Sequence, residues 1–254
     1  MGEQVRPLPG ETPAVPPARW LAGRLAVVTG ASRGIGAATA AAVAAAGAHV
    51  VLAARDRQAL DGVAGRIKDA AGHATPVPTD VSDEAAVERL FAEVARIGQL
   101  SALVCAAGVL THAPFVETTS KMWHETLGVN LTGTFLCCRA AFTAMVPAGE
   151  GRIVNIASLS GVYATEKFPG LAAYNVSKYG VVGLTETVAV EGKKYGISAI
   201  CLSPGAVDTE MLRRANPALR PGLTPDDVAE LIVALLDSPL APVSGANIPL
   251  FSNA

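Results

Sequence analysis

The chain has few aromatic residues and almost no net charge. Aromatic side chains make up 5% of the 254 residues although 50% are hydrophobic, so the core must be built from Ala, Val, Leu and Ile. Such a core is typical of helices packed closely on a parallel sheet. The formal net charge of -2 provides no basic field for nucleic acid or an anionic membrane. We therefore expect no nucleic acid and no membrane partner, but a small-molecule substrate and further copies of this chain.

Metal and disulfide chemistry also lack a signal in the sequence. The four histidines are scattered and no carboxylate-rich cluster accompanies them. The cysteines show neither metal-ligand spacing nor the pattern of a small disulfide framework. We predict no metal site, a cytoplasmic location and buried free thiols at Cys105, Cys137, Cys138 and Cys201.

Two segments at the start of the chain require separate interpretation. Residues 1–18 contain five prolines and no apolar core of a signal peptide, which predicts a flexible Pro-rich arm before a single domain over residues 19–254. The stretch between Arg33 and Arg55 has no formally charged residue, as in a membrane span. Because Gly47 divides this stretch and much of its apolar content is alanine, a packed helix followed by a buried strand fits better.

Short β-branched runs alternate with longer Ala-rich segments of helical periodicity. The strand-like runs are RLAVVTG, HVVLAA, ATPVP, ALVCAAG, RIVNIAS, ISAICLSP and a last run near 246–250. The helical segments cover about 34–46, 56–71, 82–97, 119–147, 173–194 and 224–237. This alternation predicts an α/β fold of the Rossmann type, a doubly wound parallel sheet of about seven strands with helices on both faces.

The segment TGASRGIG, residues 29–36, lies where the first strand turns into the first helix. Its three glycines allow a tight turn, a close approach of the backbone to a pyrophosphate and close packing of helix on strand. The helix N-terminus adds free N–H groups and the positive end of a dipole. The position of the motif predicts a nucleotide site.

Tyr174 and Lys178 lie four residues apart in a predicted helix, so their side chains share one face. A free tyrosine has a pKa near ~10, and a cation beside it favours the phenolate and lowers that pKa. In isolation this spacing is more typical of an ordinary surface helix. With the glycine loop in the same chain, the pair instead indicates an acid/base device.

Seven motifs in order resemble those of the short-chain dehydrogenase/reductase family, in its compact single-domain branch. They are TGxxxGxG at 29–36, Asp80-Val81, AAG at 106–108, Asn130 in VNLTG, Ser158, YxxxK at 174–178 and PGxVxT at 204–209. The match covers roughly residues 22–250. The resemblance implies an oxidoreductase that reduces a ketone to a secondary alcohol, reversibly, with a nicotinamide cofactor.

By this resemblance the catalytic residues are Asn130, Ser158, Tyr174 and Lys178. Tyr174 would donate the proton to the carbonyl oxygen, and Ser158 would donate a hydrogen bond to the same oxygen. Lys178 would lower the pKa of Tyr174 and hold the nicotinamide ribose, and Asn130 would bind a water behind Lys178. Ser160 is a competing serine that matches the family position less well.

The resemblance also implies which residues contact the cofactor. Asp80 would accept from the adenine amino group, and Val207 and Thr209 would meet the nicotinamide carboxamide. The full expected set is Gly30, Ser32, Arg33, Gly34, Ile35, Gly36, Arg55, Asp80, Val81, Ala107, Gly108, Tyr174, Lys178, Pro204, Gly205, Val207 and Thr209.

The choice between the two nicotinamide cofactors depends on charge at the end of the second strand. An acidic side chain there binds the ribose hydroxyls of NAD and repels the extra phosphate of NADP. This chain has Ala54 at that position, followed by Arg55, and a second cation, Arg33, in the glycine loop. Two guanidiniums are suited to clamp a phosphate, which favours NADP(H). NAD(H) is the alternative, with Asp56 supplying the acid.

The chain departs from the family pattern at three places. CAAG replaces NNAG through Cys105 and Ala106, which predicts fewer sheet-stabilising hydrogen bonds but unchanged chemistry. The interval from the serine to the tyrosine is about three residues longer than usual, so the loop with Tyr163, Phe168 and Leu171 would border the substrate mouth or anchor the loop in the core. The segment between Thr209 and Thr224 is a short counterpart of the substrate lid, which predicts an open site tolerant of bulky substrates.

Two alternative functions and an oligomeric assembly also have to be considered. A 3-oxoacyl-carrier-protein reductase needs a basic landing surface for its acidic carrier, and the chain offers only Lys193 and Lys194 beyond the isolated Arg152. A non-catalytic nucleotide-binding sensor or scaffold is disfavoured because all four catalytic residues are present. The family resemblance also implies a homodimer or homotetramer formed through two long helices, here about 119–147 and 173–194, and both segments are apolar enough to agree.

Overall fold

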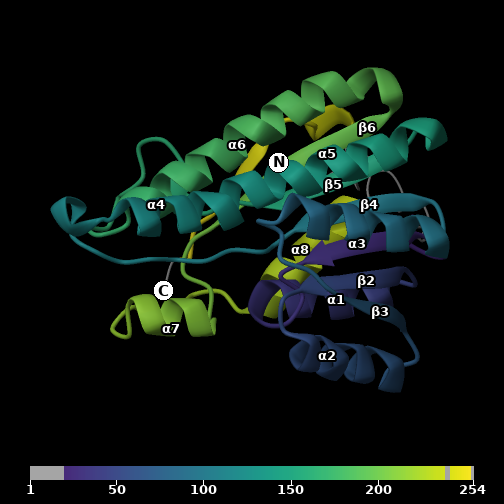
Figure 1. Cartoon of the computed structure of the whole chain (residues 1–254), viewed down its shortest axis with the longest axis horizontal. Helices are drawn as coiled ribbons and strands as arrows, with labels where there is room; N and C mark the ends of the chain where they lie inside the picture. Colours follow the sequence, from purple (N-terminus) through teal and green to yellow (C-terminus); the bar gives the residue numbers. More distant parts are fainter. Residues whose placement is uncertain (1–19, 238–240, 253–254) are drawn as a thin grey trace, which may run out of the picture.

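The computed structural model describes residues 20–237 and 241–252, and its centre is one parallel sheet of seven strands (Figure 1). The strand order is β3-β2-β1-β4-β5-β6-β7, which confirms the predicted doubly wound Rossmann-type fold. The strands are β1 Leu25–Thr29, β2 His49–Ala54, β3 His73–Pro78, β4 Leu100–Cys105, β5 Gly151–Ile156, β6 Ile197–Pro204 and β7 Asn247–Leu250. The predicted arm over residues 1–18 lies outside the described residues.

The helices occupy the predicted segments, with one addition after β6. They are α1 Gly34–Ala45, α2 Arg57–Asp69, α3 Glu84–Ile97, α4 Ser120–Leu127, α5 Gly133–Met145, α6 Ala172–Gly192, α7 Glu210–Ala215 and α8 Pro225–Asp237. Helix α7 was not apparent from periodicity because it is only six residues long. Its start is nevertheless encoded locally, since the Thr209 hydroxyl accepts from the N–H of Leu212.

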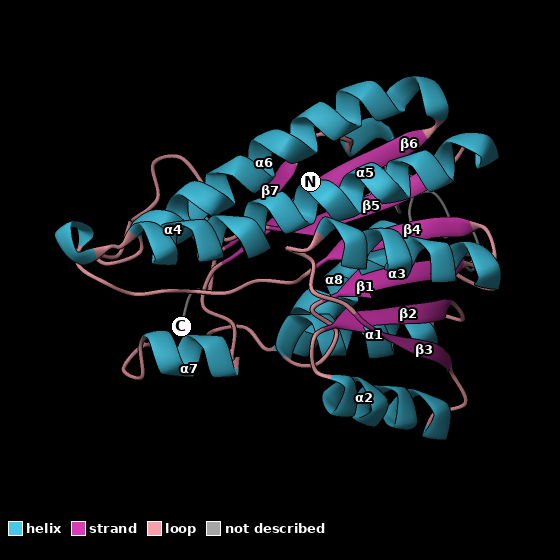
Figure 2. Ribbon diagram, viewed as in Figure 1, coloured by secondary structure: helices cyan, strands magenta, loops and turns pink. Residues whose placement is uncertain are grey.

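Helices cover both faces of the sheet (Figure 2). On one face α1, α2 and α8 bury small aliphatic residues against the strands, with α1 packed along α8. On the other face α3, α5 and the far part of α6 enclose a second core. Both cores consist almost entirely of aliphatic side chains and cysteine, as the scarcity of aromatic residues predicted. All four cysteines are buried free thiols, which confirms that prediction.

The uncharged stretch between Arg33 and Arg55 forms α1 and the buried strand β2, which confirms the packed interpretation. Among the described residues, one helix is long and apolar enough to cross a membrane by length and composition, namely Ser120–Ala148. This helix packs against α3, β4, β5 and α6, so its apolar residues belong to a core face. A π-helical turn, η2 Gly128–Thr132, separates its two halves, α4 and α5.

The connections place all the predicted site residues at one edge of the sheet. Strands β1 and β4 are neighbours, and the chain leaves them toward opposite sides, so their carboxyl ends flank a crevice. The glycine loop follows β1, and the turn with Gly108 follows β4. Ser158 follows β5, while Pro204 ends β6.

Candidate active site

Two cavities open side by side at this edge. One has a volume of about 630 Å³ and is lined by the glycine loop, the ends of β2 and β3 and the turn after β4. The other has a volume of about 710 Å³ and extends from the catalytic residues toward α7. They share the lining residues Ile35, Ala106, Gly108, Thr209 and Met211. The two cavities are therefore parts of one continuous crevice.

The glycine loop lies so close to its neighbours that side chains are excluded. Gly30 has a positive φ of 66°, and a Cβ atom there would lie 2.7 Å from the backbone of Ala107. A Cβ at Gly36 would lie 2.2 Å from the carbonyl oxygen of Gly30. Arg33 precedes α1, and no side chain caps this helix. The first N–H groups of α1 are therefore available at the edge of the cavity. The loop forms a cradle suited to a pyrophosphate.

Thr29 holds the opposite side of this cradle, a role that the sequence reading missed. Its buried hydroxyl accepts hydrogen bonds from the backbone N–H groups of Ala106 and Ala107, both at 3.2 Å. These bonds fix the CAAG turn without the asparagines of the family pattern. A threonine at the last position of a buried strand, directly before the glycine loop, was the available signal.

Asp80 lies at the end of β3 as a fixed, ionised acceptor. Its Oδ1 accepts from the backbone N–H of Ser82 at 3.0 Å and from the Ser82 hydroxyl at 2.7 Å. Partial burial raises the pKa of Asp80, but these bonds and the charge of Arg55 outweigh it, so the net pKa is lowered. Asp80 and Val81 both line the cavity of the glycine loop.

The two arginines expected at a phosphate lie on the rim of the same cavity. Arg55 is exposed and forms no ion pair within the described part of the chain. Arg33 bonds Glu210 through Nη1 at 3.0 Å, a partner that the sequence did not indicate. Asp56 accepts from the N–H of Ala59 and so caps α2.

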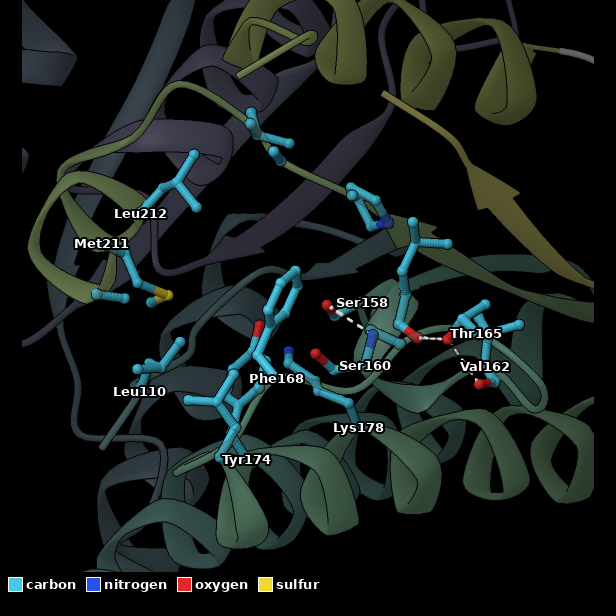
Figure 3. Close-up of a pocket in the computed structure, with 18 of the residues that line it drawn as sticks. Leu110, Ser158, Ser160, Val162, Thr165, Phe168, Tyr174, Lys178, Met211 and Leu212 are labelled. Atoms are coloured by element: carbon cyan, nitrogen blue, oxygen red, sulfur yellow. Dashed lines mark hydrogen bonds between the residues drawn. The ribbon is translucent and has the colours of Figure 1, made fainter. Parts of the chain in front are cut away.

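Tyr174 and Lys178 project from α6 into the second cavity, where Ser158 approaches from the end of β5 (Figure 3). The Lys178 ammonium donates to the carbonyl oxygen of Ile156 at 2.8 Å and lies 5.7 Å from the centre of the Tyr174 ring. The Ser158 hydroxyl accepts from the N–H of Ser160 at 3.1 Å. Three of the four predicted catalytic side chains therefore meet in one place.

Burial controls the protonation of this group. Desolvation raises the pKa of Tyr174, and interaction with the Ser158 hydroxyl opposes the rise. Desolvation lowers the pKa of Lys178 from 10.5 to about 8, against small opposing effects of Cys201 and Cys105. We expected Lys178 to lower the pKa of Tyr174, but in the structure the net pKa is raised. The low-dielectric surroundings disfavour the charged form of both groups, which the i, i+4 spacing alone could not reveal.

Asn130 lies in the π-helical turn, where its side chain has a structural role that the sequence did not indicate. Its side chain is fully buried and lines neither cavity. The amide exchanges two hydrogen bonds with the backbone of Val109, at 2.8 and 2.9 Å, and its Nδ2 also donates to the Ser177 hydroxyl. Both amide hydrogens are thus used within the protein. The side chain ties the turn after β4 to α6, and the Ser177 hydroxyl continues the link by donating to the carbonyl of Tyr174.

All the residues expected to contact the cofactor line one or both of the cavities. Gly30, Ser32, Arg33, Gly34, Ile35, Gly36, Arg55, Asp80, Val81, Ala107 and Gly108 line the first, and Tyr174, Lys178, Pro204, Gly205, Val207 and Thr209 line the second. Gly34 also meets Thr209, because a Cβ at Gly34 would lie 3.3 Å from its methyl group. Ser158 and Ser160 line the second cavity as well.

The extended loop before α6 lies at the mouth of the second cavity. Tyr163, Phe168 and Leu171 all line it, which favours the interpretation as pocket walls, although Leu171 is also buried. The ammonium of Lys167 fixes this loop by bonding the carbonyl oxygens of Leu159 and Val162, at 3.0 and 2.6 Å. No cluster of residues that could hold a metal ion occurs in the part of the chain described here.

Comparison with known proteins agrees with this geometry. A family model described as short chain dehydrogenase matches residues 24–220. A D-threitol dehydrogenase from Mycolicibacterium smegmatis is 35% identical over 240 residues, which cover 90% of this chain and 91% of that protein. A 3-oxoacyl-[acyl-carrier-protein] reductase from Synechocystis sp. is 35% identical over 231 residues, covering 87% and 92%.

Solved structures show the same likeness. A gluconate 5-dehydrogenase candidate from Beutenbergia cavernae, described as NAD(P) dependent and solved with NADP at low occupancy, is 36% identical. It superposes with a TM-score of 0.83 over 90% of this chain and 95% of that one. The range matched by the family model contains every predicted catalytic and cofactor-contacting residue.

Proposed function

The chain belongs to the short-chain dehydrogenase family and is an NAD(P)-dependent oxidoreductase of carbonyl or alcohol substrates, and we propose that it reduces a ketone to a secondary alcohol with NADPH. The reaction is reversible and uses Ser158, Tyr174 and Lys178, with Asn130 in support. The observation that carries the proposal is the convergence of Tyr174, Lys178 and Ser158 beside the glycine cradle.

The cradle fits a dinucleotide. The excluded Cβ atoms at Gly30 and Gly36 allow the backbone to contact a pyrophosphate, and Asp80 is an ionised acceptor for an adenine amino group. Lys178 faces the turn of Gly108, because a Cβ built there would lie 3.8 Å from its Nζ. The nicotinamide cofactor, when bound, supplies the hydride.

The preference for NADP(H) rests on the charges around the first cavity. Arg33 and Arg55 are both on its lining, while Ala54 brings no carboxylate and Asp56 is engaged at the start of α2. Arg33 uses one guanidinium nitrogen for Glu210, which leaves other N–H groups for a phosphate. The Beutenbergia relative was solved with NADP.

The proton comes from Tyr174. Tyr174 carries its proton at neutral pH and lines the cavity beside Ser158, so it is placed to donate as charge develops on the carbonyl oxygen. Ser158 stabilises the same developing charge. Lys178, with a pKa of about 8, is able to exchange a proton near neutral pH and so to restore the phenol after each turnover.

The test is the variant Tyr174→Phe. It removes the proposed acid and leaves the ring that fills the space, so kcat with NADPH should fall by about 10² to 10⁴ while cofactor affinity changes little. Tyr195→Phe is the matched control, because Tyr195 lies beyond the far end of α6 against Phe142. A Tyr174→Phe enzyme with more than about a tenth of normal turnover would remove this residue from the mechanism.

A second candidate, reduction of a 3-oxoacyl group on a carrier protein, is favoured by the Synechocystis relative. The lysine pair that would attract an acidic carrier, Lys193 and Lys194, lies beyond the C-terminal end of α6. Nineteen residues of helix separate it from Tyr174, about 28 Å at 1.5 Å per residue. This distance places the pair away from the cavity mouth, so we rank a free ketone first.

A further inference from the structure

The cavity beside Tyr174 has predominantly apolar walls from four separate segments. Leu110 comes from the turn after β4, Leu159 and Phe168 come from the loop before α6, and Met211 comes from α7. Phe251, directly after β7, completes the enclosure. Figure 3 shows Leu110, Met211 and Leu212 across the cavity from Ser158 and Ser160. With a volume of about 710 Å³, the space is in the range of sites for drug-sized ligands.

Most hydroxyl and amide groups of this lining are already bonded to the chain. The Thr165 hydroxyl donates to the carbonyl oxygen of Leu159 at 2.6 Å, and the hydroxyls of Ser252 and Thr209 accept from backbone N–H groups. The amide oxygen of Asn216 accepts from Ala218. The groups left to meet a substrate are few: the hydroxyls close to Tyr174, and on the outer lining the ring of His112 and the hydroxyl of Tyr163. A polyol has a hydroxyl on every carbon, and several of these hydroxyls would find no partner in the cavity, which is unfavourable in a buried site.

Within the residues that the structure describes, no lysine or arginine of this cavity is unpaired and able to meet an acidic substrate, and the other basic side chain of the lining is His112. Lys178 is deep on the cofactor side and bonded to Ile156. Lys167 is occupied by loop carbonyls. On α7, Arg213 pairs with Asp208 and Arg214 with Glu210.

The charged side chain that does line the outer cavity is the exposed carboxylate of Glu166. A substrate carboxylate or phosphate would therefore lose its hydration without gaining a counter-charge.

Three aromatic side chains at the mouth are exposed over much of their surface. Tyr163 is 87% exposed, Phe251 58% and Phe168 44%, although all three line the cavity. Aromatic faces and edges pair well with flat rings, and apolar surface concentrated at a cavity is a common sign of a ligand site. These residues supply walls for a ring rather than for an extended hydrated chain.

Resting on the proposed function, we infer that the substrate is an uncharged, mainly apolar ketone that carries a ring. Its carbonyl meets Tyr174 and Ser158, and its ring lies between the aromatic loop and α7. This substrate class differs from the polyol and sugar-acid substrates named for two of the relatives.

The decisive comparison uses two ketones that share one reacting end. Benzylacetone and levulinate both carry a methyl ketone on a two-carbon spacer, followed by a phenyl group in the first and a carboxylate in the second. With saturating NADPH, kcat/KM should be at least about 100-fold higher for benzylacetone. Oxidation of D-threitol and D-gluconate with NADP⁺ should be slower than oxidation of the benzylacetone alcohol.

Preference for levulinate or for either polyhydroxy compound overturns the substrate class and leaves the proposed function standing. Turnover of none of these compounds with either cofactor overturns the proposed function itself.

Variants locate the ring within the cavity. Phe168→Ala and Leu212→Ala remove apolar contacts from the aromatic loop and from α7, and neither residue lines the cofactor cavity. Each should lower kcat/KM for benzylacetone by about tenfold, mainly through KM. Acetone, which has no ring, should change by less than about threefold. Phe115→Ala is the control, since Phe115 is an exposed aromatic residue that does not line the cavity. Equal loss with acetone and benzylacetone, or no loss in either wall variant, would overturn the placement of the ring.

Discussion

At the scale of single residues, burial determines the chemistry of the site more than spacing does. Lys178 is buried and Tyr174 is half-buried, and desolvation favours the neutral form of each. The half-buried phenol stays protonated and available as an acid, and the buried amine, with a pKa of about 8, exchanges protons close to physiological pH. The pair is thus suited to donate and recover protons, at a cost in folding stability.

That cost predicts an unusual result for Lys178→Met. The pKa of Lys178 falls from 10.5 to about 8 on folding, so between these pH values the unfolded state binds more protons and stability rises with pH. Below pH 8 the full penalty is present, about 3 kcal/mol. Lys178→Met should therefore be inactive yet more stable than the wild type at pH 7, and the gain should shrink as pH rises from 8 to 10.5. Urea unfolding of both proteins at several pH values measures this difference. A destabilised variant at pH 7 would contradict it.

Cofactor choice is a second prediction at this scale. Ala54→Asp with Arg55→Ala deletes one cation from the rim and places a repelling charge beside it. Charge-assisted hydrogen bonds are worth about 1.5 to 3 kcal/mol, so the ratio of kcat/KM for NADPH over NADH should fall by roughly two decades. The effect should weaken at high salt because Arg55 is exposed. Arg57→Ala is the control, since its guanidinium pairs with Asp61 on α2. An unmoved ratio, or a wild-type preference for NADH, would identify the arginine assignment as wrong.

Site residues were predictable where the motif is contiguous in the sequence. They were less predictable where the interacting residue is distant in the sequence. The TGASRGIG and YxxxK segments each lie on one element, so their positions followed from the sequence. Glu210, 177 residues from its partner Arg33, did not. The hydrogen bonds of the Asn130 amide could not be predicted for the same reason, because its partners Val109 and Ser177 lie in two other segments.

At the scale of elements, the contact between the β1–α1 turn and its surroundings is the tightest feature of the cofactor cavity. The seven strands and the longer helices were predictable because each carries its own period, whereas α7 is too short to show one. The π-helical turn within the segment 120–148 was also invisible, since the apolar pattern continues through it. The turn contains Asn130, whose side chain forms hydrogen bonds with Val109 and Ser177 in other parts of the fold. These long-range contacts cannot be read from the local sequence.

Gly36→Ala tests the turn directly. The added Cβ would lie 2.2 Å from the Gly30 carbonyl, so either the loop or the start of α1 must move. We expect a loss of about 1 to 3 kcal/mol in unfolding free energy and at least about tenfold weaker cofactor binding. Gly65→Ala is the matched control, because this exposed glycine of α2 has no atom within 4 Å of the added Cβ. That control should be stabilised by up to about 1 kcal/mol. Equal cofactor affinity in both variants, measured by calorimetric titration, would mean that the cradle tolerates a side chain.

At the scale of the whole molecule, composition predicted the type of core correctly but gave no information on assembly. An Ala-rich and Val-rich core follows from the scarcity of aromatic side chains, and both faces of the sheet contain one. Association depends instead on which apolar residues remain outside these cores. Phe135 on α5 and Val190 on α6 are both exposed, and neither position could be identified as exposed from a sequence that is apolar along both helices.

We propose that α5 and α6 form an interface between copies of this chain, and the exposed residues allow a test. A charge placed in an apolar interface loses its hydration without gaining a partner, so Phe135→Asp and Val190→Asp should each shift the assembly toward monomer. The wild type should have a mass of two or four times 25.8 kDa by light scattering at the outlet of a size-exclusion column. Val116→Asp is the control, because Val116 is 91% exposed but lies in the short helix η1 Phe115–Glu117, outside α5 and α6.

Since folding is linked to association, the two interface variants should also melt at lower temperature, and the wild-type melting temperature should rise with protein concentration. A monomeric wild type would end the proposal. Assembly that survives both substitutions would place the interface on other elements.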